Sequence, residues 1–174
     1  MDIRTKLIAA AERVFDRHGF TATGMDRLTE AAGLSSRTLY KHAGSKTALI
    51  AAVLTERDRR FMQRLEVESV DALFAALEDW IAAEGARGCL FLRAAGETGG
   101  DTPEIAERVA AHKEAFRARI AAIVARETGR EDAALAEQIL VLFEGATAAA
   151  SYRGAAAVKA ARTAAAVLVA GARR

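Results

Sequence analysis

Two short helical patterns meet at the sequence Ala-Ala-Gly-Leu-Ser, inside the segment Thr23 to Lys46, and this junction constrains the fold more than any other feature. Gly33 can adopt the left-handed backbone conformation that ends a helix, because glycine has no Cβ to clash. Two residues later, the hydroxyl of Ser35 can cap the helix that follows. This punctuation predicts a helix-turn-helix, a motif whose second helix enters the major groove of DNA.

The rest of the chain also has the pattern of helices. Its 174 residues include a single proline and few runs of β-branched residues, and both features argue against β-sheets. Asp2 and Thr23 are expected to cap the first two helices, and Pro103 to open a long one. The spacing of apolar residues predicts about nine helices. They are expected at residues 3–18, 24–32, 36–42, 46–65, 70–83, 89–97, 103–128, 132–153 and 155–172.

Charge is unevenly placed along the chain, although the formal net charge is only +2. Residues 1–50 carry eight Lys or Arg against five acidic residues, which gives +3, so the remaining residues sum to −1. A positive amino-terminal end on a neutral body favours phosphate binding at that end.

The cysteine and hydropathy patterns indicate a cytoplasmic protein. The single Cys89 excludes an intrachain disulfide and is typical of a reducing compartment. The first 15 residues have charges throughout, so a signal peptide is not expected. Lys159 and Arg162 interrupt the alanine-rich carboxy-terminal segment, so we expect no membrane span.

A set of typed residues at fixed spacings covers about the first 50 positions. It consists of Phe15, Gly19-Phe20, Thr23, Ala32-Gly33-Leu34-Ser35, Thr38-Leu39-Tyr40-Lys41-His42 and Ser45-Lys46-Thr47-Ala48-Leu49. This set resembles the amino-terminal domain of the TetR family of bacterial transcriptional repressors. The body matches that family in length and helix pattern, and its segment Arg87 to Phe91 looks like one seen in some members.

Two positions depart from the family pattern. The aromatic residue that follows the histidine of the second helix is replaced by Ala43, so a core-filling ring is absent. The usual Ile-Ala pair of the helix before it is Leu28-Thr29, a milder change. Neither departure removes a group that would face DNA, so they bear on the packing of this region more than on its function.

The resemblance implies an all-α fold with a helix-turn-helix DNA-binding domain at residues 1–47 and a helical effector-binding and dimerisation domain at residues 48–174. Such a protein binds a palindromic double-stranded DNA operator as a homodimer. It represses transcription until a small-molecule effector binds the body and spoils the spacing of the two recognition helices. The alternative is a helical interaction or ligand-binding protein without specific DNA binding.

Enzymatic activity, a cofactor and a metal site are not expected. No activated nucleophile or Gly-rich phosphate loop is recognisable, and one cysteine with distant histidines is a weak pointer. His18, His42 and His112 are scattered, and none belongs to a cluster with the spacing of metal ligands.

The candidate DNA contacts lie in and beside the predicted recognition helix. Arg37 can bond a guanine edge in two places, and Thr38 can touch a base or a thymine methyl. By resemblance, Tyr40, His42 and Lys46 contact phosphates, although His42 is alternatively a structural residue. The full candidate set is Thr23, Ser35, Ser36, Arg37, Thr38, Tyr40, Lys41, His42 and Lys46.

Candidate effector contacts come from the aromatic and polar residues of the body. The aromatics serve either as core or as pocket wall, and Cys89 either as a small buried residue or as a sensor. Arg93 and Glu97 form either a surface pair or part of the pocket, since they lie one helical turn apart. The candidate set is Phe61, Trp80, Cys89, Phe91, Arg93, Glu97, His112 and Phe116.

The last two predicted helices are the expected dimer surface. Their many alanines allow two backbones to approach closely, whereas a monomeric helix pair chosen for helix propensity is the alternative. A reader of palindromic half-sites requires a two-fold partner. The expected seam residues are Leu140, Phe143, Val158, Val167 and Leu168.

Overall fold

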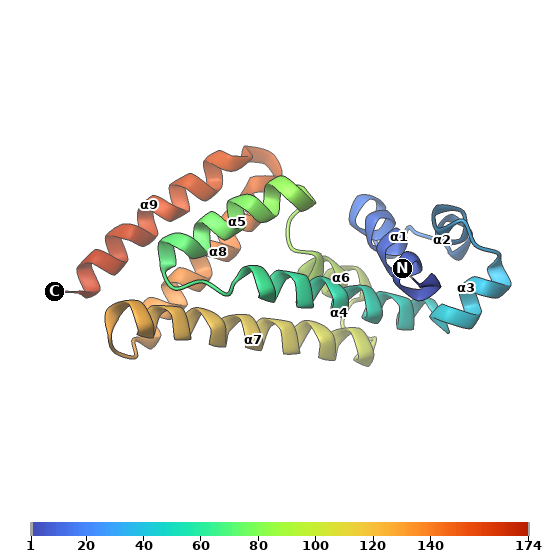
Figure 1. Ribbon diagram of the computed structural model, residues 1–174, viewed down its shortest axis with the longest axis horizontal. Coiled ribbons are helices and arrows are strands. Elements are labelled where there is room, and N and C mark those ends of the chain that lie inside the picture. The colour runs from blue at the N-terminus through green and yellow to red at the C-terminus, as the bar shows by residue number, and fades with distance from the viewer. Residues whose placement is uncertain (1, 174) are drawn as a thin grey trace. The chain divides into compact units, whose positions relative to one another are not determined.

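The computed structural model describes residues 2–173, and over that range it contains nine α-helices and no strand (Figure 1). The prediction of an all-helical fold is therefore confirmed. The helices are α1 (Ile3–His18), α2 (Met25–Ala32), α3 (Ser36–Ala43), α4 (Lys46–Arg64), α5 (Val70–Glu84), α6 (Leu90–Thr98), α7 (Pro103–Thr128), α8 (Ala133–Arg153) and α9 (Ala155–Ala172).

Most helix ends have the caps that the sequence predicts. The carboxylate of Asp2 accepts a hydrogen bond from the backbone N–H of Thr5 at 2.7 Å, and Pro103 is the first residue of α7. The prediction for Thr23 is wrong. Gly24 occupies the capping position of α2, and the buried Thr23 hydroxyl instead donates to the carbonyl oxygen of Gly19 at 2.6 Å.

The helices form two compact units. The first comprises the residues up to Arg59 together with Leu90–His112, and the second comprises Arg60–Cys89 together with the residues from Lys113 onward. Both α4 and α7 therefore contribute to both units. A functional boundary after residue 47 stays a prediction.

The first unit has a core built mainly by α1 and α4. Leu7 and Phe15 of α1 and Val53 and Leu54 of α4 are at most 1% exposed. The rings of Phe15 and Phe20 stack with their centroids 5.0 Å apart. Helices α2 and α3 add one fully buried leucine each, Leu28 and Leu39, and both short helices pack against α1.

The second unit has a larger apolar core. Helix α9 packs against both α5 and α8, as Figure 1 shows. The centre is aromatic, with the rings of Phe74, Phe116 and Phe143 all buried and in contact. Phe61 and Trp80 meet edge to face at the side of this group, with a centroid separation of 5.3 Å.

Candidate nucleic-acid interface

The turn between α2 and α3 has the geometry that the sequence predicts. Gly33 lies in the left-handed region, with φ 63° and ψ 35°, and ends α2. Ser35 then caps α3, because its hydroxyl accepts a hydrogen bond from the backbone N–H of Thr38 at 3.2 Å. The second helix of the motif is thereby fixed at its amino terminus, and Leu39 anchors its inner face.

The outer face of α3 is polar and carries no acidic residue. Its exposed residues are Ser36, Arg37, Lys41 and Tyr40, and the Tyr40 side chain is 50% exposed despite its aromatic ring. Thr38 is partly buried, and its hydroxyl shares a 2.9 Å hydrogen bond with the Ser35 hydroxyl. A helix face with two cations and several hydroxyls can contact both phosphates and base edges.

Three further candidate residues flank this face. Lys46 begins α4, and its ammonium group donates to the carbonyl oxygen of Thr21 at 3.4 Å. His42 lies partly buried in the last turn of α3. The side chain of Thr23 is fully buried, so it has no hydroxyl to offer to DNA and leaves the candidate set of side chains.

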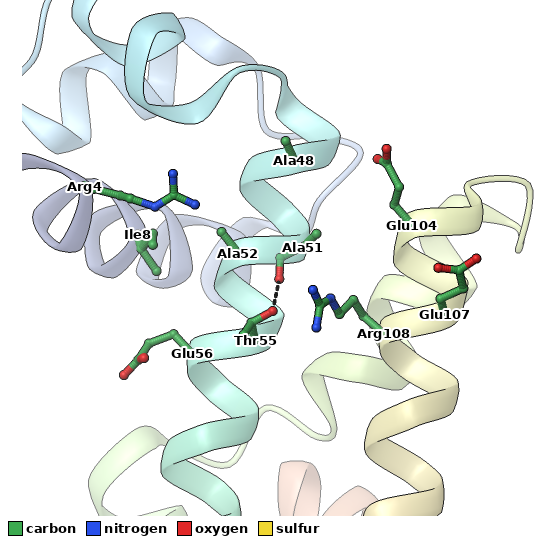
Figure 2. A pocket seen from close by; sticks show the side chains of 10 residues that line it. All are labelled: Arg4, Ile8, Ala48, Ala51, Ala52, Thr55, Glu56, Glu104, Glu107 and Arg108. Carbon is green, nitrogen blue, oxygen red and sulfur yellow. Dashed lines mark hydrogen bonds between the residues drawn. The ribbon is translucent and has the colours of Figure 1, made fainter.

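A groove of about 510 Å³ lies beside these helices, between α1, α4 and α7 (Figure 2). Its floor on α4 is formed by small residues such as Ala48, Ala51 and Ala52. Figure 2 shows the guanidinium of Arg108 reaching from α7 toward Thr55 of α4. A smaller adjoining hollow of about 330 Å³ is lined by Arg4, Leu7, Ile8, Lys41, His42, Ala43, Gly44, Ala48, Leu49 and Ala52.

The eight effector candidates fall into both units, four in each, and none of them lines either hollow. In the first unit, the rings of Phe91 and His112 stack with centroids 3.5 Å apart, and His112 Nδ1 lies 2.6 Å from a carboxylate oxygen of Asp58. Arg93 and Glu97 do not form an isolated surface pair. Arg93 donates to carbonyl oxygens in the last turn of α1, and Glu97 accepts hydrogen bonds from the turn that follows it.

In the second unit, the aromatic candidates lie in or beside the core. Trp80 and Phe116 are buried, and Phe61 contacts both rings. Cys89 is partly exposed, with its sulfur 3.5 Å from the ammonium of Lys113, which also donates to Glu144 at 2.6 Å. The observed packing of the three aromatics suits the core role that the sequence left open.

The predicted dimer residues differ in accessibility. Phe143 and Val158 are at most 2% exposed in the core of the second unit, so their side chains are unavailable to another chain. Leu140 and Leu168 pack partly against that core. Only Val167, at 69% exposed, presents its side chain fully on the surface.

Sequence reasoning missed the two largest exposed apolar residues of α8. Val141 is 62% exposed and Tyr152 is 78% exposed. Together with Gly145 and Ala148 they follow the i, i+4, i+7, i+11 spacing of a single helix face. This spacing indicates a single apolar face. However, apolar residues cover more than one face of α8, so the sequence alone does not show which face is buried.

Helices α8 and α9 are also long and apolar enough to cross a membrane, judged by length and composition. Only 28% of the apolar window of α8 and 22% of that of α9 is buried inside the chain. One or two such helices are weak evidence for a membrane span, and core helices of soluble proteins pass the same test. Among residues 2–173, no group of His, Cys, Asp or Glu is arranged to hold a metal ion.

Residues 7–53 match the family model described as bacterial regulatory proteins, tetR family. Over 61 residues the chain is 34% identical to the HTH-type transcriptional regulator UidR of Escherichia coli, a match that covers 35% of this chain and 31% of UidR. Over 51 residues it is 45% identical to the HTH-type transcriptional activator FasR of Mycolicibacterium smegmatis, covering 29% of this chain and 23% of FasR. The matched segment thus spans less than a third of either relative.

Solved structures resemble the chain over nearly its full length. A TetR-family transcriptional regulator from Streptomyces coelicolor aligns with a TM-score of 0.85 at 24% identity, covering 99% of this chain and 96% of that one. GusR of Salmonella enterica aligns with a TM-score of 0.72 at 22% identity, covering 97% and 95%. At this level of identity the likeness concerns the fold.

Proposed function

Because the chain belongs to the TetR family of transcriptional regulators, we propose that it binds a palindromic DNA operator as a homodimer and represses transcription there. A small-molecule effector bound by the helical body would release the operator. The family consists of regulators rather than enzymes, and it gives no reason to expect catalysis here.

The observation that carries this proposal is the outer face of α3. Ser36, Arg37 and Lys41 are exposed on a helix that has no acidic residue and that a serine cap and a buried leucine hold in place. Arg37 is the residue best suited to base recognition, because a guanidinium can bond both acceptors of a guanine edge. Lys41 and Lys46 suit phosphates, since an ammonium is a point charge without a planar fork.

The exposed apolar faces of α8 and α9 support the homodimer. Val141, Tyr152 and Val167 are each more than 60% exposed, and the helix faces around them are rich in alanine and glycine. Small residues allow two helix pairs to pack closely, and a two-fold partner places two copies of α3 for the two half-sites of a palindrome.

Helices α4 and α7 support control by an effector, since each runs from one compact unit into the other. A displacement of either helix in the second unit is carried along the helix into the first. A modest preference of the effector for one state suffices, because about 1.4 kcal/mol changes operator affinity about tenfold. One of the relatives described above, FasR, is a transcriptional activator, so a reporter gene behind the operator is needed to decide between repression and activation.

The test of operator binding is a selection of duplexes from a random DNA library by the full-length wild-type chain, followed by gel shifts with competitor DNA. We expect Arg37→Ala to lose about 1–3 kcal/mol at selected duplexes and to relax the preference at one base pair per half-site. Arg117→Ala, an exposed arginine of α7 paired with Glu114, is the matched control. Binding that is equally strong on all sequences would favour a helical interaction protein without specific DNA binding.

A further inference from the structure

The carboxylate of Glu97, near the end of α6, holds the turn between α1 and α2. One oxygen, Oε2, accepts hydrogen bonds from the backbone N–H of Phe20 at 2.6 Å and of Thr21 at 2.8 Å. The hydroxyl of Thr21 donates in return to the carbonyl oxygen of Glu97 at 3.1 Å. Three hydrogen bonds therefore join two segments that lie more than 70 residues apart in the chain.

The turn is shaped to receive this carboxylate. Gly19 has φ 84°, and a Cβ at this position would lie 2.9 Å from both carboxylate oxygens of Glu97. Successive backbone N–H groups that follow such a residue make a concave site for an anion. Hydrogen bonds from N–H groups to a carboxylate are about twice as strong as those between neutral groups, so this contact stabilises the turn.

Arg93, one turn earlier on α6, holds the last turn of α1. Its guanidinium donates to the carbonyl oxygens of Asp16 at 2.8 Å and Phe15 at 3.4 Å. It also lies 3.5 Å from the Asp16 carboxylate and 4.0 Å from that of Glu97. The Phe15 carbonyl oxygen also accepts from the backbone N–H of Gly19 at 2.8 Å, and a cation at this end of a helix interacts favourably with the helix dipole.

Helix α6 is itself anchored within the first unit. Phe91 and Ala94 are buried, and the Phe91 ring stacks on His112 of α7. His112 in turn bonds to Asp58 of α4. Glu97 and Arg93 therefore connect α1 and the turn after it to α6, which in turn contacts α7 and, through His112, α4. This connection is separate from the chain itself, which runs from α1 through α2 and α3 into α4.

We propose that Glu97 and Arg93 are positioning residues that set the orientation of the helix-turn-helix, so that operator recognition depends on the place of α6. The held turn leads into α2 within four residues, and its Thr21 carbonyl accepts a bond from Lys46, a proposed phosphate ligand. Helix α6 follows Cys89, the last residue of that segment of the second unit, and itself lies in the first unit with α1 and the turn after it. This inference rests on the proposed operator binding.

The test uses the full-length chain and a duplex selected by the wild type from a random library. Glu97→Ala should weaken binding to this duplex about tenfold, because the orientation competent for binding becomes a minor state. Glu97→Gln keeps an acceptor oxygen but loses the charge, so its effect should be intermediate. Glu114→Ala removes an exposed carboxylate that is paired with Arg117, and it should leave affinity unchanged.

Two further measurements separate positioning from a general loss of stability. Amide hydrogen exchange should speed up at Phe20 and Thr21 in Glu97→Ala, while amides in the second unit keep their wild-type rates. The variant should also tolerate operators whose half-site spacing is changed by about one base pair, since each recognition helix is held less firmly. If folded Glu97→Ala kept both the wild-type affinity and the wild-type discrimination between spacings, the positioning role would be overturned. The proposal of operator binding would stand.

A substitution on the other side of the contact gives an independent check. Gly19→Ala places a methyl group against the Glu97 carboxylate, and Gly129→Ala has a similar φ of 74° with no neighbour within 4 Å. Gly19→Ala should therefore weaken operator binding where Gly129→Ala does not. A wild type that selects no duplex at all would overturn operator binding itself, and the positioning role with it.

Discussion

The guanidinium of Arg57 on α4 lies 2.9 Å from the carboxylate of Glu12 on α1, and neither side chain is more than 10% exposed. Burying two charges away from water is expensive, and their attraction offsets that cost only when the geometry is good. The pair therefore makes the packing of α1 on α4 dependent on both partners being present. It ties the first helix of the DNA-binding region to the helix that runs on into the second unit.

Arg57→Met should destabilise the protein by about 3–5 kcal/mol, because it removes one member of a buried ion pair and leaves the other charge in place. Urea unfolding followed by circular dichroism measures the change. Arg59→Met removes the exposed partner of Glu56 two residues further on, and it should change the free energy of unfolding little because that pair is solvated. Similar midpoints for the two variants would show that the buried pair contributes no more than a surface one.

Lys41→Ala and Lys46→Ala should weaken DNA binding with little effect on folding. If each lysine neutralises one phosphate per subunit, a dimer loses two contacts, and the slope of log affinity against log salt concentration falls by about 1.8. Arg130→Ala changes an exposed cation of the second unit and should leave the slope as it is. An unchanged slope for both lysine variants would remove them from the set of phosphate ligands.

Local features of the sequence were enough to predict the helices and the polar outer face of α3. Helix ends depend on residues such as Asp2, Gly33 and Ser35, whose capping groups act within four residues. The short α3 has one buried leucine, so Ser36, Arg37 and Lys41 could be assigned to its outer face from spacing alone, whereas Thr38 is partly buried.

Contacts between distant segments could not be predicted in this way. The spacing of Arg93 and Glu97 says only that they share a helix face, and nothing local indicates that this face meets Phe20 and Thr21. The burial of Phe143 in the core of the second unit could not be predicted for the same reason. Apolar residues surround that helix, so only the packed structure shows that Val141 is exposed and Phe143 is not.

Stability should fall in acid partly through the contact between α5 and α9. Arg162 donates two hydrogen bonds of 2.6 Å to the Asp71 carboxylate, and these bonds hold the pKa of Asp71 below its ordinary value of 3.8. A carboxyl with a lowered pKa in the folded state stabilises the protein above its unfolded pKa, and this contribution disappears as the pH falls through the folded pKa.

Asp71→Asn should therefore flatten the dependence of melting temperature on pH between about pH 5 and about pH 2, where the wild type loses this contribution. The difference should be small, because Asp71 is 66% exposed and its interaction is screened. Thermal unfolding at several pH values measures it. A variant whose curve stays parallel to that of the wild type would show that the contact contributes nothing.

A carboxylate on the exposed faces of α8 and α9 should split the proposed dimer. Val141→Glu and Val167→Glu change residues that are exposed in the single chain, so the fold should survive, while a dimer seam would have to bury a charge. Sedimentation measures the mass, and operator binding should fall with it. Leu92→Glu, on an exposed position of α6, is the control that should remain dimeric. Intact dimers for both valine variants would place the interface elsewhere.

Ala43→Phe should be tolerated and should raise stability by about 1 kcal/mol, because the ring can fill space beside α3 and bury apolar surface. The hollow of about 330 Å³ that Ala43 lines also has Leu7, Ile8 and Leu49 in its wall, which gives an aromatic ring apolar neighbours. Ala43→Leu adds a smaller side chain and should give a smaller gain. Thermal unfolding decides the sign, since a ring forced into space that is already occupied would instead cost about 1–3 kcal/mol. A clear drop in melting temperature would mean that the loss of the aromatic residue at this position left no usable space between α1, α3 and α4.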